Sequence, residues 1–200
     1  MGMKSNLVRD GYDKVARTYL TNRDRLKSGK YVQQLLKYLS KNSRVLDLGC
    51  GAAVPIDDIL LKAGHSVTGI DISGEQIKLA RKKCPEGEYS VGDICELREG
   101  KYKAEAVVSF YTIFHISRDK QAGILKIIAS CLKQGGMLLI TMGDREFEGE
   151  HVLHGVNMWS SQYGTAKNRQ LVESSGFKIL MDELDTSGGE RHQIILAQKL

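Results

Sequence analysis

The sequence comprises 200 residues, of which 42% are hydrophobic, and its formal net charge at pH 7 is +5. A chain of this length can bury the core of one globular domain, and no apolar run reaches the roughly 20 residues that a membrane-spanning helix needs. The modest positive charge is spread along the chain, which argues against a nucleic-acid-binding domain.

The N-terminal part of the chain has helical periodicity. Apolar residues recur at helical spacing between Tyr12 and Lys37, and Ser28-Gly29 suggests a break between two helices. A buried strand is expected at Arg44–Leu48. The helices therefore precede the first strand of the predicted sheet.

A glycine-rich turn follows this strand and is the most informative feature of the sequence. The run from Val45 to Ala53 reads VLDLGCGAA, with Asp47 on the strand and a Gly-x-Gly at Gly49 and Gly51. Glycine at both turn positions permits unusual backbone angles and lets a ligand approach the main chain. A dinucleotide fingerprint would need a third glycine where Val54 stands. A strand, turn and helix without any ligand is the alternative interpretation.

Further elements alternate along the chain. Helices are expected at 55–62, 74–83, 118–132 and 165–175, with Ser73 and Thr165 as N-caps and Gln76 completing a capping box with Ser73. Strands are expected at 67–70, 89–91, 104–110, 137–142, 178–183 and 192–198. Gly135-Gly136 would end one helix, and Ser187-Gly188-Gly189 would join the last two strands as a hairpin.

This alternation predicts an α/β fold with a doubly wound parallel sheet, in which ligands bind at the carboxyl ends of the strands. Three acidic residues fall at such ends: Asp47, Asp71 and Asp93. Asp71 lies 71 − 51 = 20 residues after Gly51, where this kind of fold places a carboxylate that binds both hydroxyls of a ribose. A charge at a helix N-terminus is the alternative for Asp71, and a surface turn is the alternative for Asp93.

The acidic residue and the Gly-x-Gly turn resemble motif I of the class I S-adenosylmethionine-dependent methyltransferases. The resemblance covers Tyr12 to Leu200, and it implies one Rossmann-like domain over residues 1–200. Seven strands would form a mostly parallel sheet with an antiparallel last strand and helices on both faces. Residues 1–42 would form a helical cap over the cofactor, because the segment from Tyr12 to Tyr19 matches the family pattern Tyr-Asp-x-x-Ala-x-x-Tyr. Core packing of the two tyrosines is an equal alternative.

The resemblance also implies which residues bind S-adenosyl-L-methionine. The turn would face the methionine portion, Asp71 the ribose and Ile72 the adenine ring, while strand four would contribute its end. The expected cofactor-binding residues are Asp47, Gly49, Cys50, Gly51, Asp71, Ile72, Asp93, Ile94, Ser109, Phe110, Tyr12 and Tyr19.

The substrate side is expected beyond strand four. His115 is the candidate general base, because an unperturbed histidine titrates near neutrality; a structural histidine that caps the helix start at Ser117–Arg118 is an equal alternative. Residues 143–164 would form an insertion or lid that carries Trp159 and Tyr163, or else a packed insertion without function. His192 would open the last strand beside the substrate, as in a small-molecule branch of the family.

The sequence therefore predicts a cytoplasmic S-adenosylmethionine-dependent methyltransferase with a small-molecule acceptor. The alternatives are an RNA or protein methyltransferase and a non-catalytic cofactor-binding partner subunit. No two of the four cysteines have Cys-x-x-Cys spacing, so neither a zinc site nor a disulfide framework is expected. His151 and His154 have a metal-like spacing, but two ligands do not make a metal site. No membrane association is expected, and both a monomer and a homodimer are compatible with the sequence.

Overall fold

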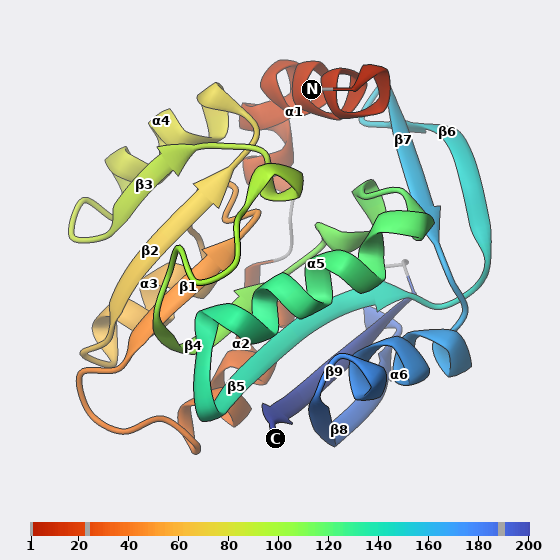
Figure 1. The fold of residues 1–200 in the computed structure, drawn as a ribbon. Coiled ribbons are helices and arrows are strands. Elements are labelled where there is room, and N and C mark those ends of the chain that lie inside the picture. The colour runs from red at the N-terminus through yellow and green to blue at the C-terminus, as the bar shows by residue number, and fades with distance from the viewer. Residues whose placement is uncertain (1, 23–24, 188–190) are drawn as a thin grey trace.

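The computed structural model describes residues 2–22, 25–187 and 191–200, and its centre is a seven-stranded sheet (Figure 1). The strand order is β3-β2-β1-β4-β5-β9-β8. The strands are β1 (Arg44–Leu48), β2 (Ser66–Asp71), β3 (Glu88–Val91), β4 (Ala104–Ser109), β5 (Leu132–Gly143), β8 (Phe177–Asp185) and β9 (His192–Lys199).

Only β9 runs against its neighbours in this sheet. Strands β1 to β5 pair in parallel, whereas β9 pairs antiparallel with both β5 and β8. The predicted doubly wound sheet with an antiparallel last strand is thereby confirmed. Two residues of the expected hairpin turn, Gly188 and Gly189, lie outside the described residues.

Helices cover both faces of the sheet. In Figure 1, α5 (Arg118–Cys131) and α6 (Thr165–Ser174) lie in front of the sheet, and α2 (Arg25–Leu36) and α3 (Ile56–Lys62) lie behind it. Each layer buries its own apolar cluster against the strands: Leu125 and Ile128 of α5 belong to one, and Leu35 and Leu60 of α2 and α3 belong to the other. The remaining helices are α4 (Gly74–Lys83) and the short η1 (Ile94–Glu96) and η2 (Ile113–His115).

The predicted helix break at Ser28-Gly29 is wrong. Helix α1 (Met3–Asn22) ends before these two residues, and both lie inside α2. Both are buried, and a Cβ at Gly29 would come within 3.2 Å of the Ile59 side chain. The glycine therefore allows α2 to pack closely on α3 and does not end a helix.

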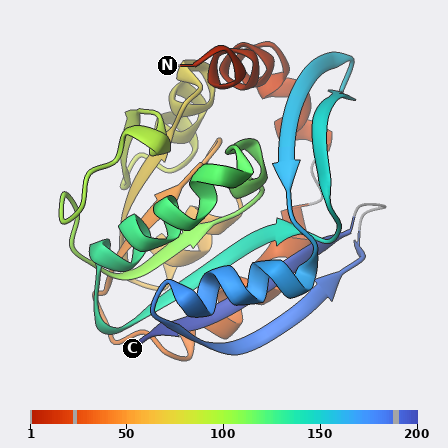
Figure 2. The ribbon, with the colours of Figure 1, turned by 45° about the vertical axis from the view of Figure 1, so that its right-hand side comes forward.

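A two-stranded hairpin occupies most of the segment expected to form an insertion. Strands β6 (Phe147–Leu153) and β7 (Val156–Gln162) pair antiparallel, apart from the main sheet. Figure 2 shows this hairpin standing upright beside α1, which crosses the carboxyl ends of the strands. Gly11 of α1 lies against Met158, where a Cβ would approach the methionine sulfur to 2.5 Å. Helix α1 and the hairpin thus pack together above the sheet.

Three local predictions need correction. Strand β5 starts at Leu132, directly after α5, so Gly135-Gly136 lies within the strand and does not precede it. Gly164, not Thr165, holds the N-cap position of α6, and no side chain caps that end. Ser73 does cap α4 through its hydroxyl, but the amide of Gln76 makes no returning hydrogen bond, so only half of the capping box forms.

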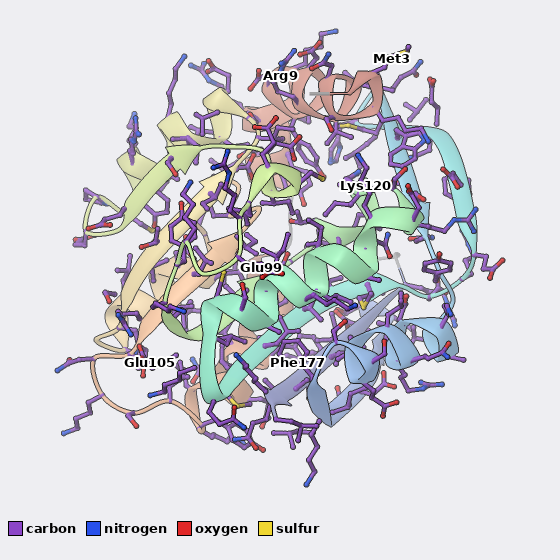
Figure 3. The ribbon with its side chains drawn as sticks, viewed as in Figure 1. Met3, Arg9, Glu99, Glu105, Lys120 and Phe177 are labelled. Carbon is purple, nitrogen blue, oxygen red and sulfur yellow. The ribbon has the colours of Figure 1, made fainter. Side chains whose placement is uncertain are left out.

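The two ends of the sheet differ in character. In Figure 3, Met3 and Arg9 mark α1 at one end, and Glu105 lies at the opposite end, near the start of β4. There Glu105 accepts hydrogen bonds from the guanidinium of Arg44 at 3.1 and 3.2 Å, and this contact lowers the pKa of Glu105 to about 2. The ion pair joins β1 and β4 at the end away from α1.

Candidate functional site

The turn after β1 favours glycine at two positions. Gly49 and Gly51 have φ angles of 83° and 54°, in the left-handed region that favours glycine. A Cβ at Gly49 would lie 1.9 Å from Oγ1 of Thr112. The Gly-x-Gly pattern therefore reflects a steric need, and it presents bare backbone at the carboxyl end of β1.

Asp71 ties this turn to α4. Its Oδ2 accepts a hydrogen bond from the N–H of Gly51 at 2.9 Å, and its Oδ1 accepts one from the N–H of Ser73 at 2.8 Å. Burial raises the pKa of Asp71 to about 6, although both N–H donors oppose this shift. A carboxylate has about four acceptor positions, so Asp71 retains capacity for the hydroxyls of a ligand.

A cavity opens above this turn, between α1 and the ends of β1, β2 and β4. Its volume is about 680 Å³ when the open solvent at its mouth is included. Its walls combine aromatic and aliphatic side chains with a few polar groups. They are Ser5, Val8, Tyr12, Tyr19, Gly49, Gly51, Asp71, Ile72, Gln76, Gly92, Asp93, Ile94, Cys95, Phe110, Tyr111, Thr112, His115 and Ile116.

Most residues predicted to bind a cofactor meet in this cavity. Two of these residues come from the glycine turn, two from the end of β2, two from the end of β3 and two, both tyrosines, from α1. Asp93 also accepts a hydrogen bond from the N–H of Cys95 at 2.9 Å and so caps η1. The predicted residues in the lining are Tyr12, Tyr19, Gly49, Gly51, Asp71, Ile72, Asp93, Ile94, Phe110 and His115.

Helix α1 forms the roof of the cavity and is anchored to α4. Asp13 accepts hydrogen bonds from the hydroxyl of Ser73 at 2.5 Å and from the N–H of Glu75 at 3.2 Å. A carboxylate at a helix N-terminus is favourable, because the first N–H groups of a helix lack partners within it. Tyr12, next to this anchor, and Tyr19 contact each other edge to face, with ring centroids 5.6 Å apart.

His115 lies between Tyr12 and the hairpin. Its Nδ1 is 2.7 Å from the carbonyl oxygen of Trp159, and its Nε2 is 2.9 Å from the hydroxyl of Tyr12. Because a carbonyl only accepts, Nδ1 carries the hydrogen in the neutral ring, and Nε2 accepts from Tyr12. The sequence connects none of these three groups, which come from α1, η2 and β7.

Burial lowers the pKa of His115 to about 4, against a smaller opposing effect of the Trp159 carbonyl. The expectation of a histidine that titrates near neutrality is therefore wrong, since desolvation disfavours the imidazolium. The alternative role as a helix cap is also not what the structure shows. The N–H of Arg118 donates instead to the hydroxyl of Ser161, at 3.0 Å.

Three predicted cofactor residues lie outside the lining. Ser109 is fully buried and its hydroxyl donates to the carbonyl of Leu48 at 2.8 Å, so it cannot reach a ligand in the cavity. Asp47 and Cys50 are buried below the turn, with 2% and 8% of their surfaces exposed. Any influence of these two side chains on a ligand passes through the turn itself.

The three predicted substrate residues also lie behind the walls of the cavity. Trp159 is buried in β7 and reaches the cavity only through the hydrogen bond of its carbonyl to His115. The ring of Tyr163 lies 5.5 Å from the guanidinium of Arg118. His192 contacts the ring of Tyr111 edge to face at 5.0 Å, so it supports a residue of the wall.

Gln76 is a residue of this site that the sequence interpretation missed. The capping-box pattern assigned it a structural role only. It is 1% exposed, it lines the cavity, and neither its Nε2 nor its Oε1 has a hydrogen-bond partner within the protein. Buried amides are almost always hydrogen-bonded, so this pair of atoms points to a polar ligand. An amide residue in the first turn of α4, shortly after Asp71, was the available signal.

The part of the chain that the structure describes holds neither a metal-binding cluster nor a membrane-spanning helix. Within residues 2–22, 25–187 and 191–200, no group of three or more histidine, cysteine or acidic side chains is arranged to hold a metal ion. Over the same ranges, every helix is too short or too polar to cross a membrane.

Comparison with known proteins gives one consistent picture. Residues 45–136 match the model of a methyltransferase domain. A carboxy-S-adenosyl-L-methionine synthase of Campylobacter curvus is 32% identical over 74% of this chain and 68% of its own, and a ubiquinone biosynthesis O-methyltransferase of Coxiella burnetii is 24% identical over 88% and 80%. Magnesium protoporphyrin IX methyltransferase of Synechocystis with bound S-adenosylmethionine has the same fold, with a TM-score of 0.77, 17% identity and coverage of 100% of this chain and 99% of that one.

The sheet order, the turn and the acidic strand ends thus define a class I Rossmann-like methyltransferase. The chain belongs to the S-adenosylmethionine-dependent methyltransferases. The cavity fits this cofactor on two observations of its own: the bare backbone that Gly49 and Gly51 present in its wall, and an unpartnered amide at Gln76.

Proposed function

We propose that the protein transfers a methyl group from S-adenosylmethionine to a small-molecule acceptor in the cavity under α1. S-adenosylmethionine supplies an activated methyl group on a sulfonium sulfur, so the protein mainly binds, orients and manages a proton. Asp71 and Gln76 would hold the ribose side, Ile72, Asp93 and Ile94 the adenine side, and the glycine turn the methionine side.

The observation that carries the small-molecule assignment is the enclosure of the cavity. Helix α1 covers it through the anchor of Asp13 on Ser73, and the β6–β7 hairpin closes it beside His115. Aromatic walls such as Tyr19 and Phe110 suit a compact, largely apolar acceptor. The names of the ubiquinone O-methyltransferase and the magnesium protoporphyrin IX methyltransferase point to acceptors of this size.

The residues that line the cavity also favour methyl transfer over synthesis of a carboxylated cofactor. The name of the Campylobacter curvus relative indicates that it makes carboxy-S-adenosyl-L-methionine. A further buried carboxylate would need a cationic partner. No lysine or arginine is among the described residues that line the cavity, so the geometry supports an acceptor without an anionic group near the reacting centre.

Tyr12 and His115 would take up the proton of the acceptor. Neutral His115 accepts from the Tyr12 hydroxyl, and both residues line the cavity. Because the pKa of His115 is lowered to about 4, it is a weak base. The pair therefore suits an acceptor whose own proton leaves easily, such as a phenol, or a nitrogen nucleophile that its hydrogen bonds orient.

One labelling experiment separates this function from its alternatives. The purified protein is incubated with cell extract and S-adenosylmethionine carrying a labelled methyl group. Label in small metabolites supports the proposal, whereas label in RNA or protein assigns a macromolecular acceptor. Binding of S-adenosylhomocysteine without any labelled product would instead support a cofactor-binding partner subunit.

We also propose that the protein acts in the cytoplasm. All four cysteines are free thiols in the structure, which suits the reducing conditions of the cytoplasm.

A further inference from the structure

Asp57 is a buried carboxyl that neither the fold nor the proposed methyl transfer explains. It lies in the first turn of α3, directly after the glycine turn, and is 0% exposed. Neither of its carboxyl oxygens accepts a hydrogen bond from a donor group among the described residues. A buried ionised carboxylate without donors is very costly, so its protonation state needs an explanation.

The groups that face Asp57 supply no positive charge. Asp47 on β1 and Tyr89 on β3 are its polar neighbours, although the Tyr89 hydroxyl makes no hydrogen bond to it, and the thiols of Cys50 and Cys84 lie near it. Burial raises the pKa of both thiols and of the Tyr89 hydroxyl above their usual values. These three groups are therefore neutral near pH 7, and Asp47 is the only neighbouring group that can carry charge there.

Two carboxyl groups in contact can form a hydrogen bond only if one of them brings a proton. Two carboxylates would present acceptors to each other and repel. Burial, together with the contact with Asp47, raises the pKa of Asp57 well above its usual value. The N-terminal position on α3 favours the charged form only slightly, whereas burying an unpaired ion carries a much larger desolvation cost. The desolvation cost therefore outweighs the effect of the helix N-terminus, and Asp57 keeps its proton.

We propose that Asp57 is a positioning residue of the cofactor site, whose carboxyl keeps a proton and donates it to Asp47. The pair then holds one negative charge beneath the Gly49–Gly51 turn, with the acceptor oxygens of Asp47 fixed in place. This inference rests on the assignment of S-adenosylmethionine to the cavity. A single fixed negative charge below the turn suits the cationic end of that cofactor, and a second one would destabilise the turn before binding.

Infrared difference spectroscopy tests the proton directly. A protonated carboxyl has a carbonyl stretch that is separate from the bands of a carboxylate. The wild-type protein at pH 8, where Asp71 with its pKa of about 6 is ionised, should show this band. Asp57→Asn should abolish it. Asp58→Asn is the matched control, because Asp58 is on the same helical turn but forms an ion pair with Lys62 at 2.8 Å, and it should leave the band unchanged.

Calorimetric titration with S-adenosylmethionine tests the positioning role. Asp57→Asn keeps a neutral donor toward Asp47, so its affinity should stay within about twofold of wild type. Asp57→Leu removes the donor and Asp47→Asn removes the charge, so each should weaken binding by roughly tenfold. Thermal unfolding of each variant confirms that it is folded before titration.

The outcomes separate this inference from the proposed function. Absence of the carboxyl band in wild type, or a tenfold loss of affinity in Asp57→Asn, would show that Asp57 is ionised and overturn the inference. Failure of the wild-type protein to bind S-adenosylmethionine would overturn the proposed function, whatever the infrared spectrum shows.

Discussion

Tyr12 and His115 are 103 positions apart in the sequence, yet the hydroxyl of one lies 2.9 Å from Nε2 of the other. The carbonyl of Trp159 fixes the ring of His115 from its opposite side. Helix α1, the short helix η2 and the β6–β7 hairpin therefore meet in one chain of hydrogen bonds at the wall of the cavity. Under the proposed function, this chain of hydrogen bonds would accept a proton from a bound molecule.

Removing the Tyr12 hydroxyl should slow turnover without weakening cofactor binding. Tyr12→Phe should lower kcat by about 10- to 100-fold, because proton transfer from a positioned side chain typically contributes 10²- to 10⁴-fold and His115 remains. His115→Gln should act on the same step, so the double variant should be less impaired than the product of the single effects. Steady-state kinetics and titration with S-adenosylhomocysteine measure both quantities.

Tyr38→Phe is the matched control for this prediction, since Tyr38 is a surface residue with 51% exposure. Its kinetics should equal those of wild type. A Tyr12→Phe enzyme with normal kcat would show that the acceptor loses its proton without help from this pair.

The pH profile of catalysis should lack a limb near pH 6.5 from His115. Its pKa is lowered to about 4, so the ring is neutral over the range in which a typical histidine titrates. In the folded protein His115 binds fewer protons than in the unfolded chain between about pH 4 and 6.5, so its contribution to stability falls as the pH drops through that window. His115→Gln should flatten the loss of stability on the acid side in denaturant titrations, and an unchanged slope would contradict the assigned environment.

Cofactor affinity should instead depend on Asp71. Its folded pKa of about 6 is above the ordinary value of 3.8, and the ionised form is the better acceptor for two hydroxyls. Affinity for S-adenosylhomocysteine should be constant above about pH 7 and fall by up to tenfold per pH unit below about 6. The stability of the ligand-free protein should respond in the opposite sense. It should fall as the pH rises from about 4 to about 6, because Asp71 keeps its proton longer in the folded protein than in the unfolded chain. Asp71→Asn should remove both dependences, and a flat profile in wild type would contradict the assignment.

Replacing Gln76 by an apolar residue should maintain or raise the stability of the ligand-free protein and weaken ligand binding. Gln76→Leu removes a buried amide without partners, so the ligand-free protein should unfold at an equal or higher temperature. The same change should weaken S-adenosylhomocysteine by roughly tenfold, because the ligand loses a hydrogen bond in a buried site. Gln121→Leu is the contrasting control: its Nε2 donates to the carbonyls of Ile113, Ile116 and Ser161, so that variant should lose stability. Equal affinity of Gln76→Leu and wild type would limit Gln76 to packing.

The sequence predicted the sheet, and the placement of Asp71 beside the glycine turn, well because their signals are local. A steric need at Gly49 and a carboxylate 20 residues after Gly51 both follow from short motifs on neighbouring strands. The break at Ser28-Gly29 was mispredicted because a glycine that permits close helix packing and a glycine that ends a helix look alike in sequence.

The substrate side was harder to predict because its geometry depends on long-range contacts. Sequence placed His115 near the cleft but could not show its burial, which moves its pKa away from neutrality. Trp159 and His192 were predicted to touch the substrate, whereas one acts through its carbonyl and the other supports Tyr111. The sequence also could not show which groups surround Asp57 on α3, since Asp47 and Tyr89 come from β1 and β3.

The central claim is that the cavity under α1 binds S-adenosylmethionine through Asp71. Calorimetric titration of S-adenosylhomocysteine into wild type, Asp71→Ala and the surface control Asp58→Ala tests it most directly. The account predicts that Asp71→Ala weakens binding by roughly 2–3 kcal/mol, because two hydroxyls lose a charged acceptor, and that Asp58→Ala binds like wild type. Equal affinity of Asp71→Ala and wild type would contradict the account, because it would place the ribose elsewhere.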